Sequence, residues 1–95
     1  MDLTFPDKFN RTIRLTTERT HHIGSHMSLQ DKFDLIEQTL KYPDQITQDE
    51  NYPQTFHYQT YLKPEHLYFI ITVRVFNGDG FIITIFKSPK LKQTQ

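Results

Sequence analysis

The sequence predicts an α+β fold in which N-terminal helices pack on one face of an antiparallel sheet of about four strands. Two observations support this class. Apolar residues recur at helical spacing between residues 28 and 43, whereas aromatic and β-branched residues dominate the runs after residue 54. Because helix-forming segments come first and a meander of strands follows, the helices are expected to cover one side of the sheet.

The chain has 95 residues, which predicts a single domain over residues 1–95 with a core over about residues 13–92. It is too short for a cofactor domain beside a substrate domain, so any catalytic domain must be compact. No cofactor is expected. Cysteine is absent, which excludes disulfides, a thiolate nucleophile and cysteine-ligated metal sites. No opening apolar run resembles a signal peptide and no apolar run could span a bilayer, so the predicted location is the cytoplasm.

The first predicted element lies near residue 13. Ile13–Leu15 is either a short strand or the lead into a helix. Thr16 or Thr17 is a suitable N-cap, because a threonine hydroxyl accepts a hydrogen bond from a free amide of the first turn. Gly24 breaks this helix or caps its C-terminus.

A second, amphipathic helix is predicted to follow. Ser28–Asp31 resembles a capping box with aspartate in the usual glutamate place. Apolar residues then recur at spacings of four, three and four, at Leu29, Phe33, Ile36 and Leu40. Pro43 ends the helix, since proline disfavours helical backbone at the residue before it.

The remaining elements are predicted strands. Gln45–Thr47 begins the sheet, and Thr55–Leu62 and Leu67–Phe76 carry the aromatic and β-branched residues typical of strands. Asn77–Gly80 supplies residues that tolerate positive φ, so Leu67–Phe76 and Phe81–Phe86 are expected to form an antiparallel hairpin.

The aromatic residues have two interpretations. Those expected in the core are Phe33, Phe69 and Phe81. Three tyrosines, Tyr58, Tyr61 and Tyr68, either pack in the sheet or stack on bases. His57 and His66 have no motif support and are assigned structural roles.

The formal net charge is zero but unevenly distributed. Residues 1–27 carry +1, residues 28–53 carry −4 and residues 54–95 carry +3 when histidine is counted as neutral. If the fold brings the two ends together, they form one positive face able to hold a polyanion, with an acidic surface behind it. The alternative is an ordinary mixed surface.

One arginine and three histidines fall within residues 19–26. Imidazoles that titrate near neutral pH beside a fixed positive charge are what metal-free cleavage of RNA requires. The structural alternatives are an ion pair for Arg19 and a local hydrogen bond for His22. His22 and His26 are four apart, a spacing compatible with zinc, but no motif supplies further ligands, so no metal site is expected.

Several motifs, taken in order, resemble a known superfamily. Ile13-x-Leu15-Thr16-x-Glu18-Arg19-x-x-His22-Ile23-x-x-His26 is followed by the amphipathic helix, Leu40-x-x-Pro43-Asp44-x-Ile46, a strand hairpin and Phe81-Ile82-Ile83-Thr84. This order is similar to that of the phage-type nucleases of the barnase/EndoU/colicin/RelE-like (BECR) superfamily. The resemblance covers about residues 13–92 and implies a nuclease-like domain with a RelE-like fold.

The resemblance also implies a metal-independent endoribonuclease, used as a toxin or in defence, in which the 2′-hydroxyl of RNA attacks the neighbouring phosphorus. His22 and His26 would transfer protons, and Arg19, assisted by Lys87, would stabilise the phosphorane charge. Thr84 or Ser88 would orient a phosphate oxygen. The predicted substrate-binding residues are Lys87, Ser88 and Lys90.

The chain also departs from the superfamily pattern. Met27 stands where a proline is expected, and Ile85-Phe86 stands where an Ala-Tyr pair is expected, so a tyrosine hydroxyl is missing. Residues 24–27 also match an expression-tag remnant. If they are one, His26 has no functional role. The alternative function is therefore a catalytically inactive RNA-binding or protein-interaction module. The predicted partners are RNA and an antitoxin or effector-complex protein, with no membrane.

Overall fold

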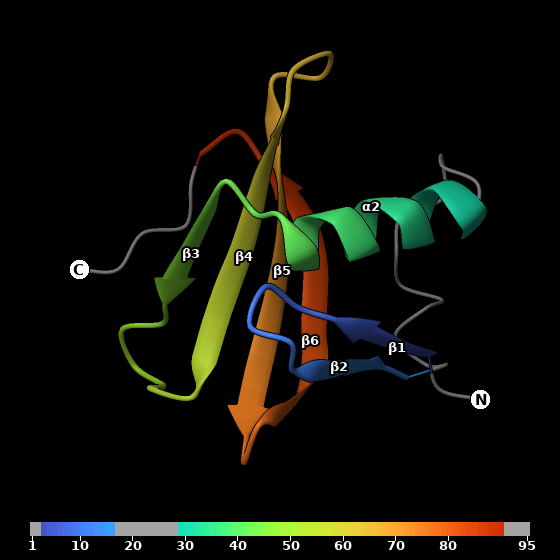
Figure 1. The fold of residues 1–95 in the computed structure, drawn as a ribbon. Helices are drawn as coiled ribbons and strands as arrows, with labels where there is room; N and C mark the ends of the chain where they lie inside the picture. The colour runs from blue at the N-terminus through green and yellow to red at the C-terminus, as the bar shows by residue number, and fades with distance from the viewer. Residues whose placement is uncertain (1–2, 17–28, 91–95) are drawn as a thin grey trace.

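The computed structural model describes residues 3–16 and 29–90, which form one curved sheet and one helix (Figure 1). The strands are β1 (Leu3–Pro6), β2 (Thr12–Leu15), β3 (Gln45–Gln48), β4 (Thr55–Leu62), β5 (Leu67–Phe76) and β6 (Asp79–Ser88). The helix is α2 (Leu29–Lys41). The strand order is β1-β2-β6-β5-β4-β3, and every neighbouring pair is antiparallel except β2 and β6, which run parallel.

The predicted fold class is wrong. The described residues form a six-stranded mixed sheet with one helix, instead of N-terminal helices on about four antiparallel strands. The prediction missed β1 and left β2 as one of two alternatives, because a four-residue strand has too little alternation to exclude a helix. The predicted helix ending at Gly24 lies outside the described residues, apart from Thr16, which is not helical.

Other predicted elements are confirmed. Helix α2 buries Ile36 and Leu40 completely and ends two residues before Pro43. Strands β4 and β5 have the predicted bounds, and β5 pairs with β6 as the expected hairpin. Its turn is formed by Asn77 and Gly78, both with positive φ, so β6 begins at Asp79, earlier than predicted.

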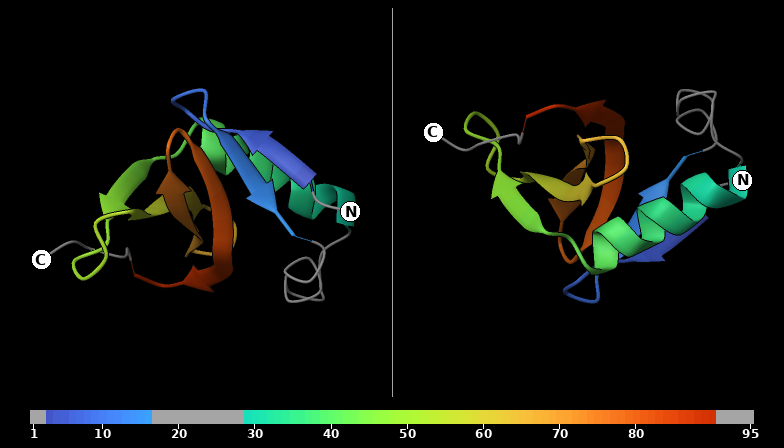
Figure 2. Two further views of the ribbon diagram at one scale, coloured as in Figure 1. Left: turned by 90° about the horizontal axis from the view of Figure 1, so that it is seen from below. Right: turned by 90° about the horizontal axis from the view of Figure 1, so that it is seen from above.

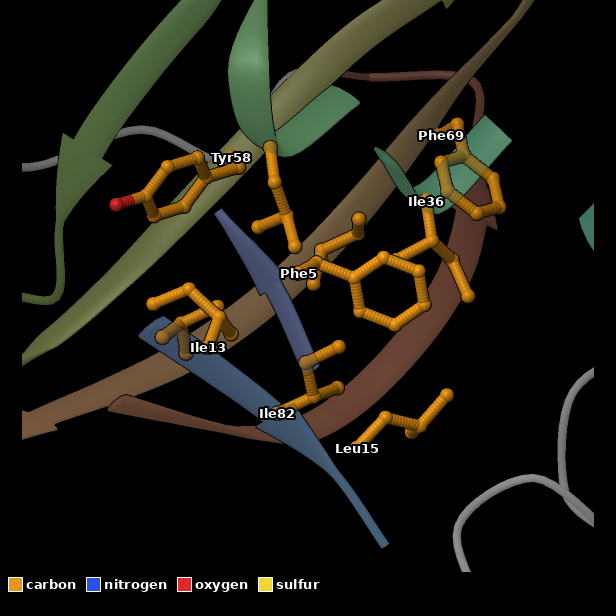
Figure 3. Close-up of a cluster of buried hydrophobic side chains, with 10 residues drawn as sticks. Phe5, Ile13, Leu15, Ile36, Tyr58, Phe69 and Ile82 are labelled. Atoms are coloured by element: carbon orange, nitrogen blue, oxygen red, sulfur yellow. The ribbon is translucent and has the colours of Figure 1, made fainter. Parts of the chain in front are cut away.

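The core lies between α2 and one side of the sheet. Helix α2 packs against β1, β4 and β5, and the sheet curves strongly from β1 to β3 (Figure 2). The buried cluster comprises Phe5, Ile13, Leu15, Ile36, Leu40, Tyr58, Phe69, Ile71, Val73 and Ile82 (Figure 3). Phe33 packs against this cluster and Phe69 belongs to it, as predicted, whereas Phe81 is exposed, so its assignment to the core is wrong.

We call the side of the sheet that packs on α2 the helix face and the other side the outer face. Successive side chains of a strand point to opposite faces, and paired residues of neighbouring strands share a face. Since Phe69, Ile71 and Val73 lie in the core, the residues between them belong to the outer face. Outer-face residues of β4, β5 and β6 include His57, Gln59, Tyr68, Ile70, Thr72, Arg74, Phe81, Thr84, Phe86 and Ser88.

A β-bulge in β6 decides which of its side chains reach the outer face. Val73 pairs with Ile82 and Thr72 pairs with Thr84, so Ile83 is an extra residue without a partner in this register. A bulge of this kind shifts the alternation of the strand by one residue. Phe81 and Phe86 therefore share the outer face although they are an odd number of residues apart.

Glycine is required where β2 meets β6. Gly80 pairs with Ile13, and a Cβ atom built on Gly80 would lie 2.9 Å from Ile13 Cδ1 and 3.1 Å from the Arg74 carbonyl oxygen. A backbone oxygen cannot yield as a flexible side chain can. The absence of a side chain at Gly80 thus allows β2 and β6 to pair closely.

No helix in residues 3–16 or 29–90 is long and apolar enough to cross a membrane.

Candidate functional site

The predicted site residues fall into two groups. Arg19, His22 and His26 lie outside the described residues. Of the others, Thr84 and Ser88 share the outer face of β6. Thr84 is exposed, as expected for a strand threonine that points away from an apolar layer.

The two predicted lysines of this segment lie elsewhere. Lys87 is paired with Phe69 and belongs to the helix face, where its Nζ donates to Glu65 Oε1 at 2.6 Å. Lys90 follows β6, is exposed, and its backbone N–H donates to Ser88 Oγ at 3.2 Å. Lys87 therefore does not join Thr84 and Ser88, whereas Lys90 stays near them through Ser88.

Three exposed phenylalanine rings lie on the outer face of β5 and β6: Phe76 and Phe81 at the hairpin turn, and Phe86 farther along β6, beyond Thr84. Phe76, Phe81 and Phe86 are 44%, 40% and 37% exposed. The rings of Phe76 and Phe81 are stacked, with centroids 6.3 Å apart and planes 19° apart. Large apolar side chains grouped on one face of a strand pair, instead of scattered singly, mark an interaction surface.

Positive charge accompanies these rings. Arg74 is paired with Phe81 across β5 and β6, and its Nε donates to Thr55 Oγ1 at 3.4 Å. The guanidinium carbon of Arg74 lies 5.7 Å from the ring centroid of Tyr52, within the range of a cation–π contact. Arg74 is thus held over the outer face beside the phenylalanine rings.

The centre of the outer face holds a buried hydroxyl–imidazole–carboxylate chain. His57 is 5% exposed, and its Nδ1 lies 2.9 Å from Thr72 Oγ1 while its Nε2 lies 3.0 Å from Asp49 Oδ1. The second oxygen of Asp49 accepts the backbone N–H groups of Asn51 and Tyr52. The hydrogen bond from His57 holds the pKa of Asp49 below its ordinary value.

This chain of contacts fixes the tautomer of neutral His57. With Asp49 ionised, Nε2 carries the proton and donates it to the carboxylate, so Nδ1 accepts a hydrogen bond from the Thr72 hydroxyl. Both ring nitrogens are then occupied within the protein. The arrangement ties the loop after β3 to the middle of the sheet, and it leaves no ring nitrogen aimed at an external substrate.

A second aspartate cluster lies on the helix face, under the turn between β1 and β2. Asp7 Oδ2 accepts hydrogen bonds from the Tyr58 hydroxyl at 2.6 Å and from Arg11 Nε at 2.9 Å. Asp7 Oδ1 accepts the backbone N–H groups of Phe9 and Arg11. Figure 3 shows the Tyr58 hydroxyl pointing away from the apolar core.

Electrostatics keep this cluster charged. Burial raises the pKa of Asp7, but the hydrogen bonds from Tyr58 and Arg11 outweigh burial and hold the pKa below its ordinary value. Burial and the bond to Asp7 raise the pKa of Tyr58 well above its ordinary value, so the phenol stays protonated and continues to donate. Because Tyr58 is fully buried in this role, the interpretation that it stacks on bases is wrong.

Sequence reasoning missed the shared face of Phe76, Phe81 and Phe86. The residues themselves were visible, but the bulge at Ile83 that aligns Phe81 with Phe86 has no sequence signal such as glycine. It also missed the contact of His57 with Asp49, because this pair depends on how the loop after β3 folds back over β4. A histidine inside a strand otherwise rich in aromatic residues was the only available hint.

Comparisons with known proteins identify no relative of this chain. No protein-family model matches it, and neither the curated proteins nor the solved structures contain a significant match. The resemblance to the BECR nucleases therefore stays a prediction, and the fold that it implied differs from the observed six-stranded sheet.

Proposed function

We propose that the outer face binds single-stranded RNA. The observation that carries this proposal is the group of three exposed phenylalanines, Phe76, Phe81 and Phe86, on one face of neighbouring strands. RNA-binding sheets present aromatic rings in this way, and unpaired bases stack on them. Stacking tolerates any base because every base has a flat aromatic surface.

The groups between and beside the rings suit a sugar–phosphate backbone. Thr84 and Ser88 place hydroxyl groups on the same face as Phe86. Arg74 adds a guanidinium next to Phe81, and Lys90 lies just beyond the strand. Hydroxyl and cationic groups are the usual partners of phosphate and ribose oxygens.

Positive charge near the rings favours RNA over a neutral protein partner. Among the described residues, Arg74 lies on the outer face beside Phe81, and Lys90 follows the end of β6. Positive charge attracts a polyanion and adds little to a purely apolar protein interface. A protein partner, such as an antitoxin or an effector subunit, is the competing outcome of the experiment below.

Fluorescence anisotropy with a labelled single-stranded RNA tests the proposal. Phe81→Ala and Phe86→Ala are each expected to weaken binding by about fivefold or more, since stacking on one ring contributes about 1–3 kcal/mol. Phe9→Ala is the matched control, because Phe9 is an equally large ring, 58% exposed, on the turn between β1 and β2. An RNA duplex of the same sequence is expected to bind more weakly because its bases are already stacked.

Two results would reject RNA binding at this face. One is the absence of binding to any single strand at low salt, where phosphate contacts are strongest. The other is equal weakening by Phe81→Ala and Phe9→Ala. Loss of a stable protein complex on Phe81→Ala, without RNA binding, would instead establish the protein-interaction alternative.

Metal-independent cleavage of RNA is a second candidate. Thr84, its predicted threonine, pairs with Thr72 and so lies beside the Thr72–His57 contact on the surface proposed to hold RNA. The purified protein would be incubated with labelled RNA in EDTA, with matching DNA and His22→Ala as controls. Cyclic 2′,3′-phosphate ends made only by the parent protein would support cleavage. If the protein bound RNA but left it intact, it would be a non-catalytic RNA-binding module.

A further inference from the structure

A separate groove lies away from the outer face, beside the turn between β1 and β2. It has a volume of about 490 Å³, within the range of small-ligand sites. Its lining residues are Asp7, Lys8, Asn10, Lys41, Tyr42 and Pro43. The groove thus separates the β1–β2 turn from the segment that leaves helix α2.

Hydrogen bonds hold both walls of this groove in place. The backbone N–H of Lys8 donates to the Leu40 carbonyl oxygen at 2.9 Å, which joins the turn to the last turn of α2. The Tyr42 N–H donates to the Gln38 carbonyl oxygen at 2.7 Å. The four hydrogen bonds to Asp7 keep the turn itself closed. The site is therefore formed before a ligand arrives, which lowers the entropic cost of binding.

The groove is positively charged. The Asp7 side chain is 0% exposed and its charge is balanced by Arg11, so it presents little negative charge to a ligand. Lys8 and Lys41 have no carboxylate partner within ion-pair distance among residues 3–16 and 29–90. The C-terminus of α2 opposes an anion with about half a negative elementary charge, which two ammonium groups exceed.

The exposed ring of Tyr42 lies beside these charges. Tyr42 is 68% exposed, and Lys41 Nζ lies 5.8 Å from the centroid of its ring. Pro43 follows it, and the Asn10 amide offers both a donor and an acceptor. An exposed tyrosine ring beside two cations matches a ligand that has a planar base and a phosphate.

We propose that this groove binds a nucleotide, with its phosphate between Lys8 and Lys41 and its base on the ring of Tyr42. The same chemistry exists in a free mononucleotide and at the 5′-phosphorylated end of an RNA strand. The proposal does not depend on RNA binding by the outer face, because no lining residue of the groove belongs to that face.

NMR titration of the ¹⁵N-labelled full chain with AMP, adenosine and inorganic phosphate tests the site. AMP is expected to bind more tightly than either fragment and to shift the amide signals of Lys8, Asn10 and Tyr42. Lys8→Gln and Lys41→Gln should each weaken AMP binding by about fivefold or more, since each removes a charge-assisted contact with phosphate. Lys63→Gln, which removes an exposed lysine from the turn after β4, should change it less than about twofold.

Tyr42→Ala separates a nucleotide site from a simple anion site. It should weaken AMP binding while leaving the affinity for inorganic phosphate unchanged. Equal affinities for AMP and phosphate, with no effect of Tyr42→Ala, would overturn the nucleotide assignment. So would AMP binding that Lys8→Gln and Lys41→Gln leave intact, or no binding by a chain whose spectrum shows that it is folded.

Two oligonucleotides distinguish the sources of the nucleotide. A 5′-phosphorylated RNA that binds more tightly than its 5′-hydroxyl counterpart, with the difference lost in Lys8→Gln, would assign the groove to RNA ends. Equal binding of both oligonucleotides, together with AMP binding, would assign it to a free nucleotide. Loss of RNA binding in Phe81→Ala with AMP binding retained would show that the groove and the outer face act separately.

Discussion

His57 and Tyr58 are neighbours on β4, and each holds a loop by hydrogen bonding to an aspartate, but they do so on opposite faces of the sheet. Tyr58 contacts Asp7 under the turn between β1 and β2. His57 contacts Asp49 in the loop after β3. One strand therefore anchors two distant loops through consecutive side chains, because successive residues of a strand alternate in direction.

The two anchors differ in charge and burial. On the helix face, Asp7 is a fully buried side chain that meets a permanently charged Arg11 and a phenol that stays protonated. On the outer face, the Asp49 side chain is partly exposed and its partner is the imidazole of His57 instead of a guanidinium. The first anchor therefore mainly stabilises the fold, whereas the second positions a loop beside the proposed RNA surface.

Asp7→Ala should lower the stability of the fold more than any other substitution considered below. It removes the acceptor of four hydrogen bonds and leaves the Tyr58 hydroxyl and Arg11 without their charged partner. We expect a loss of about 3 kcal/mol in the free energy of unfolding, measured by urea denaturation. A loss below about 1 kcal/mol would show that water replaces the carboxylate and that this anchor does not dominate.

A smaller loss is expected for His57→Ala. It removes two hydrogen bonds and leaves a cavity between Thr72 and Asp49, at a cost of about 1–2 kcal/mol. His66→Asn serves as the control, because His66 is exposed, has φ 56°, and asparagine tolerates that backbone. If His57→Ala destabilised the chain more than Asp7→Ala, the ranking of the two anchors would be reversed.

The smallest effect concerns acid pH. The pKa values of Asp7 and Asp49 are both lowered from 3.8 in the folded state. A carboxyl group of this kind contributes its stability fully above its unfolded-state pKa and loses it as the pH falls through the folded-state pKa. Below about pH 4, the stability of Asp7→Asn should therefore fall less steeply than that of the parent chain.

Asp49→Asn should produce a weaker form of the same change, because Asp49 is partly exposed and solvent reduces the strength of its interactions. Thermal unfolding between pH 2 and 7 would measure both slopes. Identical slopes in the parent chain and Asp7→Asn would mean that other carboxyl groups control acid unfolding.

Long elements with a clear period could be predicted from the sequence. Helix α2 has four apolar residues along one face, which identifies it as an amphipathic helix. Strands β4, β5 and β6 are long enough for their aromatic and β-branched residues to identify them as strands. The short strands β1 and β2 could not be assigned as strands from the sequence, because four residues are compatible with both a helix and an extended segment. Since these strands were not assigned, the parallel pairing of β2 with β6 could not be predicted either.

Only part of the candidate site could be predicted. The direction of Thr84 followed from its apolar neighbours, Ile83 and Ile85, and the structure places it on the outer face. The position of Lys87 followed from the same alternation, because Lys87 is three residues after Thr84 and so points to the opposite face, where it contacts Glu65; grouping Lys87 with Thr84 in one site was therefore inconsistent with a strand. The grouping of the exposed rings depends on the bulge at Ile83, a tertiary feature that composition does not encode.

The parallel pairing of β2 with β6 also has a consequence for protein synthesis. Ile13 pairs with Gly80, which is synthesised 67 residues later. Contacts between distant residues form slowly, and until they form the β1–β2 hairpin exposes an unpaired edge. The pairing with β6 therefore completes the burial of Ile13, which has no exposed surface in the folded protein.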